Sequence, residues 1–169
     1  MNELSDEIRR NILSKGFSTV NHVGITVSNL DKSIEFYEAL TGKKIVNRDE
    51  LSGKRMAQTQ GLDNTLIRYA NLHLDNINLD ILEYVEPKST KAHYTNDQIS
   101  ALHLCLEVED LKAAVARLKE IGVEPEGEPI YFEEQDGLKS GFGTGVVYFR
   151  DPDGTSLELI EPKGPFKRG

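Results

Sequence analysis

The chain has 169 residues, 38% of them hydrophobic, which suits one compact domain or two small fused modules. Its net charge of −8 and pI of about 5.1 leave no basic stripe for phosphates, so nucleic acid and anionic membrane partners are not expected. The N-terminal stretch MNELSDEIRRNILSKGF lacks the apolar core of a signal peptide, and no apolar run is long enough for a membrane helix. The single cysteine, Cys105, cannot form an internal disulfide. We therefore expect a cytoplasmic protein.

Residues 4–14 carry apolar side chains at helical spacing, which predicts an N-terminal helix within residues 1–18. A first unit follows over residues 19–88. It opens with a strand from His22 to Val27 and a helix that Asn29 or Asp31 caps and Gly42 ends. Three strands complete the unit: Lys44 to Asn47, Leu66 to Leu74 and Ile77 to Val85.

Residues 89–100 form a polar linker, and a second unit covers residues 101–162 before a tail of residues 163–169. This unit also reads as strand, helix and three strands. The elements are Leu102 to Val108, a helix capped by Asp110, Val123 to Pro125, Gly145 to Arg150 and Ser156 to Glu161. Its first strand and helix align with those of the first unit without a gap, which indicates an internal repeat.

A histidine stands near the start of the first strand in each unit, at His22 and His103. Side chains alternate between the two faces of a strand, so both histidines point away from the apolar face that packs on the helices. Considered singly, each would more often be a structural histidine than a ligand. Their equivalent places in a repeat favour a converging pair.

Carboxylates on the last strand of each unit could join these histidines. Glu158 falls on the histidine side of its strand by alternation, and Asp80 occupies the matching place in the first unit. A competing register compares LEYVEP with LELIEP and selects Glu83 instead of Asp80. We favour Asp80, because the Glu83 register would turn Asp80 toward the helix layer, where an unpaired acid is costly.

Two imidazoles and two carboxylates make a plausible site for one divalent metal ion. The predicted ligands are His22, Asp80, His103 and Glu158. Zn, Ni, Co, Mn and Fe all suit such a mixed set. The structural alternative is that the acids are solvated residues at the edge of a sheet.

The sequence resembles the vicinal oxygen chelate superfamily, which includes glyoxalase I, methylmalonyl-CoA epimerase, fosfomycin-resistance enzymes and extradiol dioxygenases. The stretches that carry the resemblance are NHVGITVSNLDKSIEFYEALTG, ALHLCLEVEDLKAAVARLKEIGV and VYFRDPDGTSLELIEP. It implies an α+β fold of two tandem βαβββ modules, which form a cup-shaped, mainly antiparallel sheet around a divalent metal, with helices on the outer face. An Asp at position 80 departs from the Glu or Gln of glyoxalases and epimerases.

The resemblance also implies a chemistry. A glyoxalase-like isomerase, epimerase or lyase would act on a small vicinal-oxygen substrate through an enediolate or enolate, with Glu158 as the carboxylate that moves the proton. One alternative is an Fe(II) extradiol-type dioxygenase, and another is a metal-free small-molecule-binding protein of the resistance type. Related proteins build the cup within one chain or between two chains, and we expect a homodimer.

Overall fold

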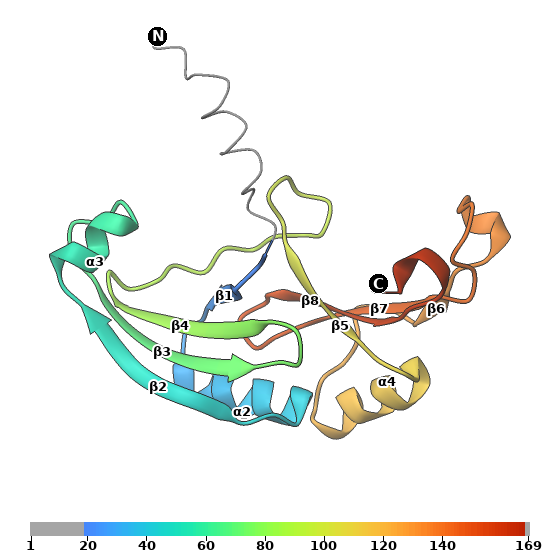
Figure 1. Cartoon of the computed structure of the whole chain (residues 1–169), viewed down its shortest axis with the longest axis horizontal. Helices are drawn as coiled ribbons and strands as arrows, with labels where there is room; N and C mark the ends of the chain where they lie inside the picture. Colours follow the sequence, from blue (N-terminus) through green and yellow to red (C-terminus); the bar gives the residue numbers. More distant parts are fainter. Residues whose placement is uncertain (1–18, 168–169) are drawn as a thin grey trace, which may run out of the picture.

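The computed structural model describes residues 19–167, so the predicted N-terminal helix lies outside the described part of the chain. Two similar modules lie side by side (Figure 1). The first contains β1 (His22–Thr26), α2 (Leu30–Thr41), β2 (Ile45–Ser52), α3 (Lys54–Thr59), β3 (Leu66–His73) and β4 (Asn78–Glu86). The second contains β5 (His103–Glu107), α4 (Leu111–Glu120), β6 (Ile130–Tyr131), η1 (Glu134–Asp136), β7 (Gly145–Arg150), β8 (Ser156–Glu161) and η2 (Gly164–Phe166).

Each module forms one four-stranded sheet with the same topology. The strand orders are β1-β4-β3-β2 and β5-β8-β7-β6. The first strand of each module pairs in parallel with the last, and the other pairings are antiparallel. The sheets are therefore mainly antiparallel, as predicted, and both β1 and β5 are outer strands.

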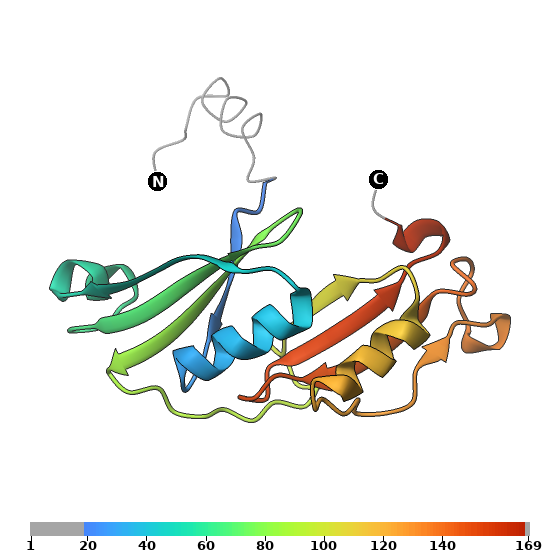
Figure 2. The same cartoon turned by 90° about the horizontal axis from the view of Figure 1, so that it is seen from below.

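The two long helices cover the same face of the molecule (Figure 2). Asn29 caps α2 by accepting a hydrogen bond from the amide of Lys32, and Asp110 caps α4 through the amide of Ala113. Gly42 ends α2 in the left-handed region, at φ 70°, where a side chain would be strained. The predicted caps thus fix where both helices start and where α2 stops.

A single hydrophobic core runs through both modules beneath the sheets. It is built from the helix-facing residues of the strands and the inner faces of α2 and α4. Fully buried members include Leu30, Tyr37, Ile81, Phe149 and Leu157. The opposite face of each sheet is left for polar side chains.

The β7–β8 turn reaches from the second module into the first. The hydroxyl of the buried Tyr37 donates to the carboxylate of Asp151 over 2.9 Å, and the Ser28 amide donates to Asp153 over 2.9 Å. Asp151 also accepts from the amides of Asp153 and Thr155. These bonds fix one module against the other, because a buried carboxylate left without donors is costly.

Two element predictions were wrong. Val123 to Pro125 form no strand: Val123 continues the turn after α4, proline has no amide to donate, and the strand that pairs with β7 is Ile130–Tyr131. The short helix α3 was not predicted, because Ala57 is its one buried residue and no apolar stripe marks it. Over the described residues, no helix is long and apolar enough to cross a membrane.

Candidate functional site

His22 and Asp80 form a pair on the face of the first sheet that the helices leave open. The imidazole Nε2 lies 3.7 Å from a carboxylate oxygen of Asp80. The other ring nitrogen, Nδ1, is 2.9 Å from the side-chain oxygen of Asn21, which can only accept a hydrogen bond. In the tautomer that donates from Nδ1 to Asn21, the Nε2 lone pair is available to a metal ion.

Asn71 holds the Asp80 carboxylate in place. Its side-chain amide donates to Asp80 over 2.6 Å, and its oxygen accepts from Asn47 over 3.0 Å. The two asparagines lie on neighbouring strands at the same register position, so they form a polar row that leads to Asp80.

His103 and Glu158 form the equivalent pair on the second sheet. The imidazole Nε2 lies 3.1 Å from a Glu158 carboxylate oxygen. The two histidine side chains are similarly open, at 49% exposed for His22 and 45% for His103, whereas Glu158 as a residue is only 8% exposed. Each module thus presents one accessible imidazole beside one carboxylate.

Cys105 and Tyr148 flank Glu158 on the two neighbouring strands. The ring of Tyr148 meets that of His103 edge to face, with centroids 5.4 Å apart and planes at 84°. Burial raises the pKa of the Tyr148 hydroxyl to about 12, and the charge of Glu158 and a hydrogen bond with it act in the same direction. Neither residue was predicted to belong to the site, although strand alternation places both on the histidine side.

Cys105 is exposed, although a lone cysteine among alternating leucines is more often a small buried residue. Partial burial of the thiol, followed by the charge of Glu158, raises its pKa to about 12. The flanking Leu104 and Leu106 point to the helix side, and alternation turns Cys105 to the other.

Glu83 lies on the opposite face from His22 and has a different task. Its carboxylate accepts from the Leu30 amide at the start of α2 over 3.1 Å and pairs with Arg68 over 3.0 Å. Glu161 does the same for the Leu111 amide at the start of α4 over 3.0 Å. The two-fold repeat therefore matches Asp80 to Glu158 and Glu83 to Glu161.

The two histidine–carboxylate pairs do not meet within one chain. Among residues 19–167, no three His, Cys, Asp or Glu side chains gather closely enough to hold a metal ion. The pairs lie on separate sheets, and both histidines stand on outer strands. The described part of one chain consequently carries two separate histidine–carboxylate pairs.

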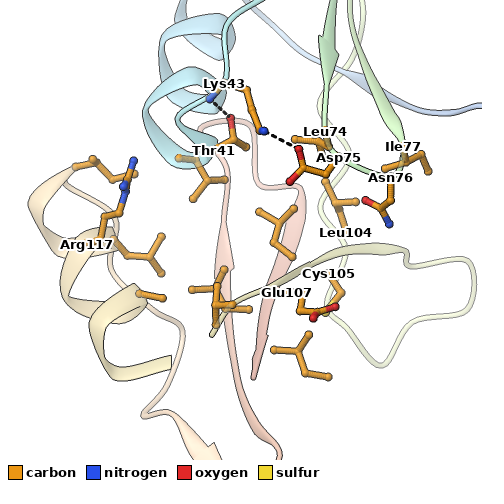
Figure 3. Close-up of a pocket in the computed structure, with 18 of the residues that line it drawn as sticks. Thr41, Lys43, Leu74, Asp75, Asn76, Ile77, Leu104, Cys105, Glu107 and Arg117 are labelled. Atoms are coloured by element: carbon orange, nitrogen blue, oxygen red, sulfur yellow. Dashed lines mark hydrogen bonds and ion pairs between the residues drawn. The ribbon is translucent and has the colours of Figure 1, made fainter. Parts of the chain in front are cut away.

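A cavity of about 560 Å³ opens elsewhere, between the modules (Figure 3). Its walls are mainly apolar side chains of β5 and α4, with the β3–β4 turn and the end of α2 opposite. Lys43 and Asp75 form an ion pair of 2.6 Å at its rim. None of the four predicted metal ligands lines this cavity, but it opens along β5, the outer strand that carries His103.

The contacts of Arg150 favour a structural role over binding of an anionic substrate. Its guanidinium binds Glu126 over 2.8 Å, the Asn96 side chain over 3.0 Å and two backbone carbonyls, so it ties the linker to the second module. His93 lies exposed in that linker, outside both pairs.

A family model described as Glyoxalase/Bleomycin resistance protein/Dioxygenase superfamily matches residues 19–159, which include both modules. The chain belongs to this superfamily. A 2-epi-5-epi-valiolone epimerase from Actinomyces sp is 32% identical over 160 residues, which cover 90% of this chain and 85% of the relative. A lactoylglutathione lyase from Neisseria meningitidis serogroup A is 26% identical over 142 residues, covering 84% and 89%.

Solved structures of the superfamily share the fold. A glyoxalase family protein from Bacillus cereus has a TM-score of 0.75 at 22% identity, covering 90% of this chain and 99% of its own. A fosfomycin resistance protein from Listeria monocytogenes has a TM-score of 0.61 at 17% identity, covering 88% and 96%. The predicted family and the predicted α+β fold are both confirmed.

Members of the superfamily commonly bind a divalent metal, and the donors present here fit such an ion as halves of a site. Each half offers one imidazole nitrogen and one carboxylate, a set that borderline divalent ions accept. The bonds from Asn21 to His22 and from Asn71 to Asp80 are of the kind that orient metal ligands.

Proposed function

We propose that this protein is a divalent-metal-dependent, glyoxalase-like enzyme: an isomerase, epimerase or lyase that acts on a small substrate with vicinal oxygens. The observation that carries the proposal is the repeated imidazole–carboxylate pair, at His22 with Asp80 and at His103 with Glu158. The names of the two relatives, an epimerase and a lyase, support this class of activity.

We also propose that two chains complete each site. A second copy would bring its His103 sheet against the His22 sheet of the first, so that four donors surround one ion. The outer positions of β1 and β5 support this arrangement, because an uncovered outer strand offers its backbone to another strand. The apolar cavity beside β5 also offers surface for a partner to bury.

In this arrangement His22, Asp80 and His103 would hold the ion, together with Glu158. The bound ion supplies positive charge that stabilises negative charge on the substrate oxygens. Glu158 is the residue that accepts a proton from the substrate carbon and returns it. Its position supports the role, because it is the more enclosed of the two site carboxylates, with 10% of its side chain exposed against 22% for Asp80.

A dioxygenase with two histidines and one carboxylate is less well supported. That function predicts that both Asp80 and Glu83 lie away from the metal, whereas Asp80 stands beside His22. A metal-free binding protein would need neither pair.

Elemental analysis of protein purified without a histidine tag or chelator tests the proposal. We expect one divalent ion per chain in the parent and none in His103→Ala. The control is His93→Ala, which removes an exposed histidine outside both pairs and should keep the ion. A parent that takes up no Zn, Ni, Co, Mn or Fe would contradict the metal-dependent function and favour the binding protein.

A further inference from the structure

The two carboxylates of the proposed site are held by different neighbours. Asp80 lies between Gly24 and Asn71 on the adjacent strands, and Glu158 lies between Cys105 and Tyr148. Gly24 has no side chain that could hold Asp80, and the hydrogen bond that holds this carboxylate comes from Asn71, at 2.6 Å. In the second half, the matching place to Asn71 is filled by a tyrosine.

Tyr148 is the residue that contacts both members of its pair. Its ring packs edge to face on His103, and strand pairing places it opposite Glu158, whose carboxylate interacts with its hydroxyl. His103 and Glu158 are themselves 3.1 Å apart. One side chain therefore limits both the rotation of the imidazole and the choice of glutamate rotamer.

We propose that Tyr148 is a positioning residue of the metal site, which orients the Glu158 carboxylate through its hydroxyl and the His103 ring through its aromatic face. This inference rests on the proposed function, because it assigns Tyr148 a task toward ligands of the ion. The physical reason is the length of glutamate: it has one more rotatable bond than aspartate, so it needs a second contact to hold one orientation.

Tyrosine in one half and asparagine in the other suit the different lengths of the two carboxylates. The short Asp80 is fixed by one amide, and its histidine is oriented independently by Asn21. No bond from a neighbouring side chain to Nδ1 of His103 matches the one from Asn21 within residues 19–167. The aromatic contact from Tyr148 orients the His103 ring instead.

Binding of Co²⁺ to the full-length chain tests the inference, with the visible absorption of the bound ion as the readout besides affinity. Tyr148→Phe keeps the ring and removes the hydroxyl. Tyr148→Gln returns a hydrogen-bond donor, as Asn71 supplies for Asp80. Tyr69→Phe is the matched control, because Tyr69 lies on the same face of the first sheet and its hydroxyl contacts Asn47, at 3.5 Å, rather than a proposed ligand.

We expect Tyr148→Phe to weaken Co²⁺ binding about tenfold and to shift the absorption bands, since loss of a partner to a metal ligand has effects of this size. Tyr148→Gln should recover part of the affinity, and Tyr69→Phe should match the parent. Far-UV circular dichroism and melting of the metal-free variants check that all are folded.

Two outcomes would contradict the positioning role of Tyr148 and the metal site, respectively. A Tyr148→Phe protein with the affinity and spectrum of the parent would refute the positioning role and leave the proposed function intact. A parent that binds no Co²⁺ would refute the metal site itself, and the role of Tyr148 with it.

Discussion

Glu158 and Glu161 stand three residues apart on β8 and face opposite sides of the sheet. Glu158 meets His103 on the open face, whereas Glu161 receives the Leu111 amide at the start of α4 and the Lys163 ammonium at 2.9 Å. The Leu111 amide and then Lys163 hold the pKa of Glu161 below its ordinary value of 4.5. Identical side chains thus serve a proposed chemical role and a structural one.

The depressed pKa of Glu161 predicts how Glu161→Gln changes stability with pH. The charged carboxylate favours the folded chain, so the stability it contributes is fully present above pH 4.5 and is lost as the pH falls through the lower, folded-state pKa. We expect the variant to be less stable than the parent at neutral pH and the two to converge in acid. Urea unfolding across this pH range measures the difference.

Glu124→Gln is the control for this prediction, because Glu124 is exposed and lies outside the helix cap. A Glu161→Gln difference that stayed constant into acid would show that the charge is not the cause.

Alternation along a strand was enough to place Glu158 on the histidine side and to favour Asp80 over Glu83. It could not say which neighbour each carboxylate would meet, since that depends on strand pairing. Asn71 and Tyr148 come from the preceding strand of each hairpin, and only the register brings them opposite Asp80 and Glu158. The small side chain of Cys105 suggests burial, whereas strand alternation places it on the open face with His103.

The helices show which elements can be predicted from the sequence. Both α2 and α4 begin at a capping side chain, Asn29 and Asp110, and carry an apolar stripe, so their start and type were predictable. β6 has two residues and α3 has six, too few for a periodic pattern to stand out. Their formation depends on contacts with β7 and on the neighbouring β2–β3 hairpin.

Removing the cap of α4 tests the contribution of this element. Asp110→Ala removes the acceptor for the Ala113 amide at 3.0 Å, and such a loss costs about 1 kcal/mol of stability. Denaturant unfolding should show a lower midpoint with an unchanged slope.

Lys112→Ala changes an exposed residue of the same helix and should leave that midpoint nearly unchanged. If Lys112→Ala lowered the midpoint as much as Asp110→Ala, the loss would reflect a general change in helix stability rather than the missing cap.

At the scale of the whole molecule, the sequence did not predict how the two modules are placed relative to each other. The repeat predicted two similar units, and the family resemblance predicted a cup. Neither indicated whether the cup forms within one chain or between two chains. The buried bond from Tyr37 to Asp151 and the bond from the Ser28 amide to Asp153 join segments that lie far apart in the sequence. They fix the second module against the first.

Mixing two defective variants tests whether a site spans two chains. One variant carries His22→Ala with Asp80→Ala, and the other carries His103→Ala with Glu158→Gln. Neither should hold the ion alone. After the two are unfolded and refolded together, a mixed dimer regains one intact site, because it combines the sound first module of one chain with the sound second module of the other.

Isotope-labelled mass spectrometry of the intact assembly measures the ion in the mixed dimer, with each variant refolded alone as the control. Sites formed within single chains would give no ion in the mixture, and that result would contradict the shared cup.

The separation of the two histidine–carboxylate pairs has a consequence for mass action. In the proposed dimer, dilution below the dissociation constant of the chains would release the ion while each chain stays folded, since the core lies within one chain. Conversely, the ion would hold the chains together, so chelation would promote dissociation. Metal affinity and self-association would then be two readings of one linked equilibrium, and each would vary with the concentration of the protein.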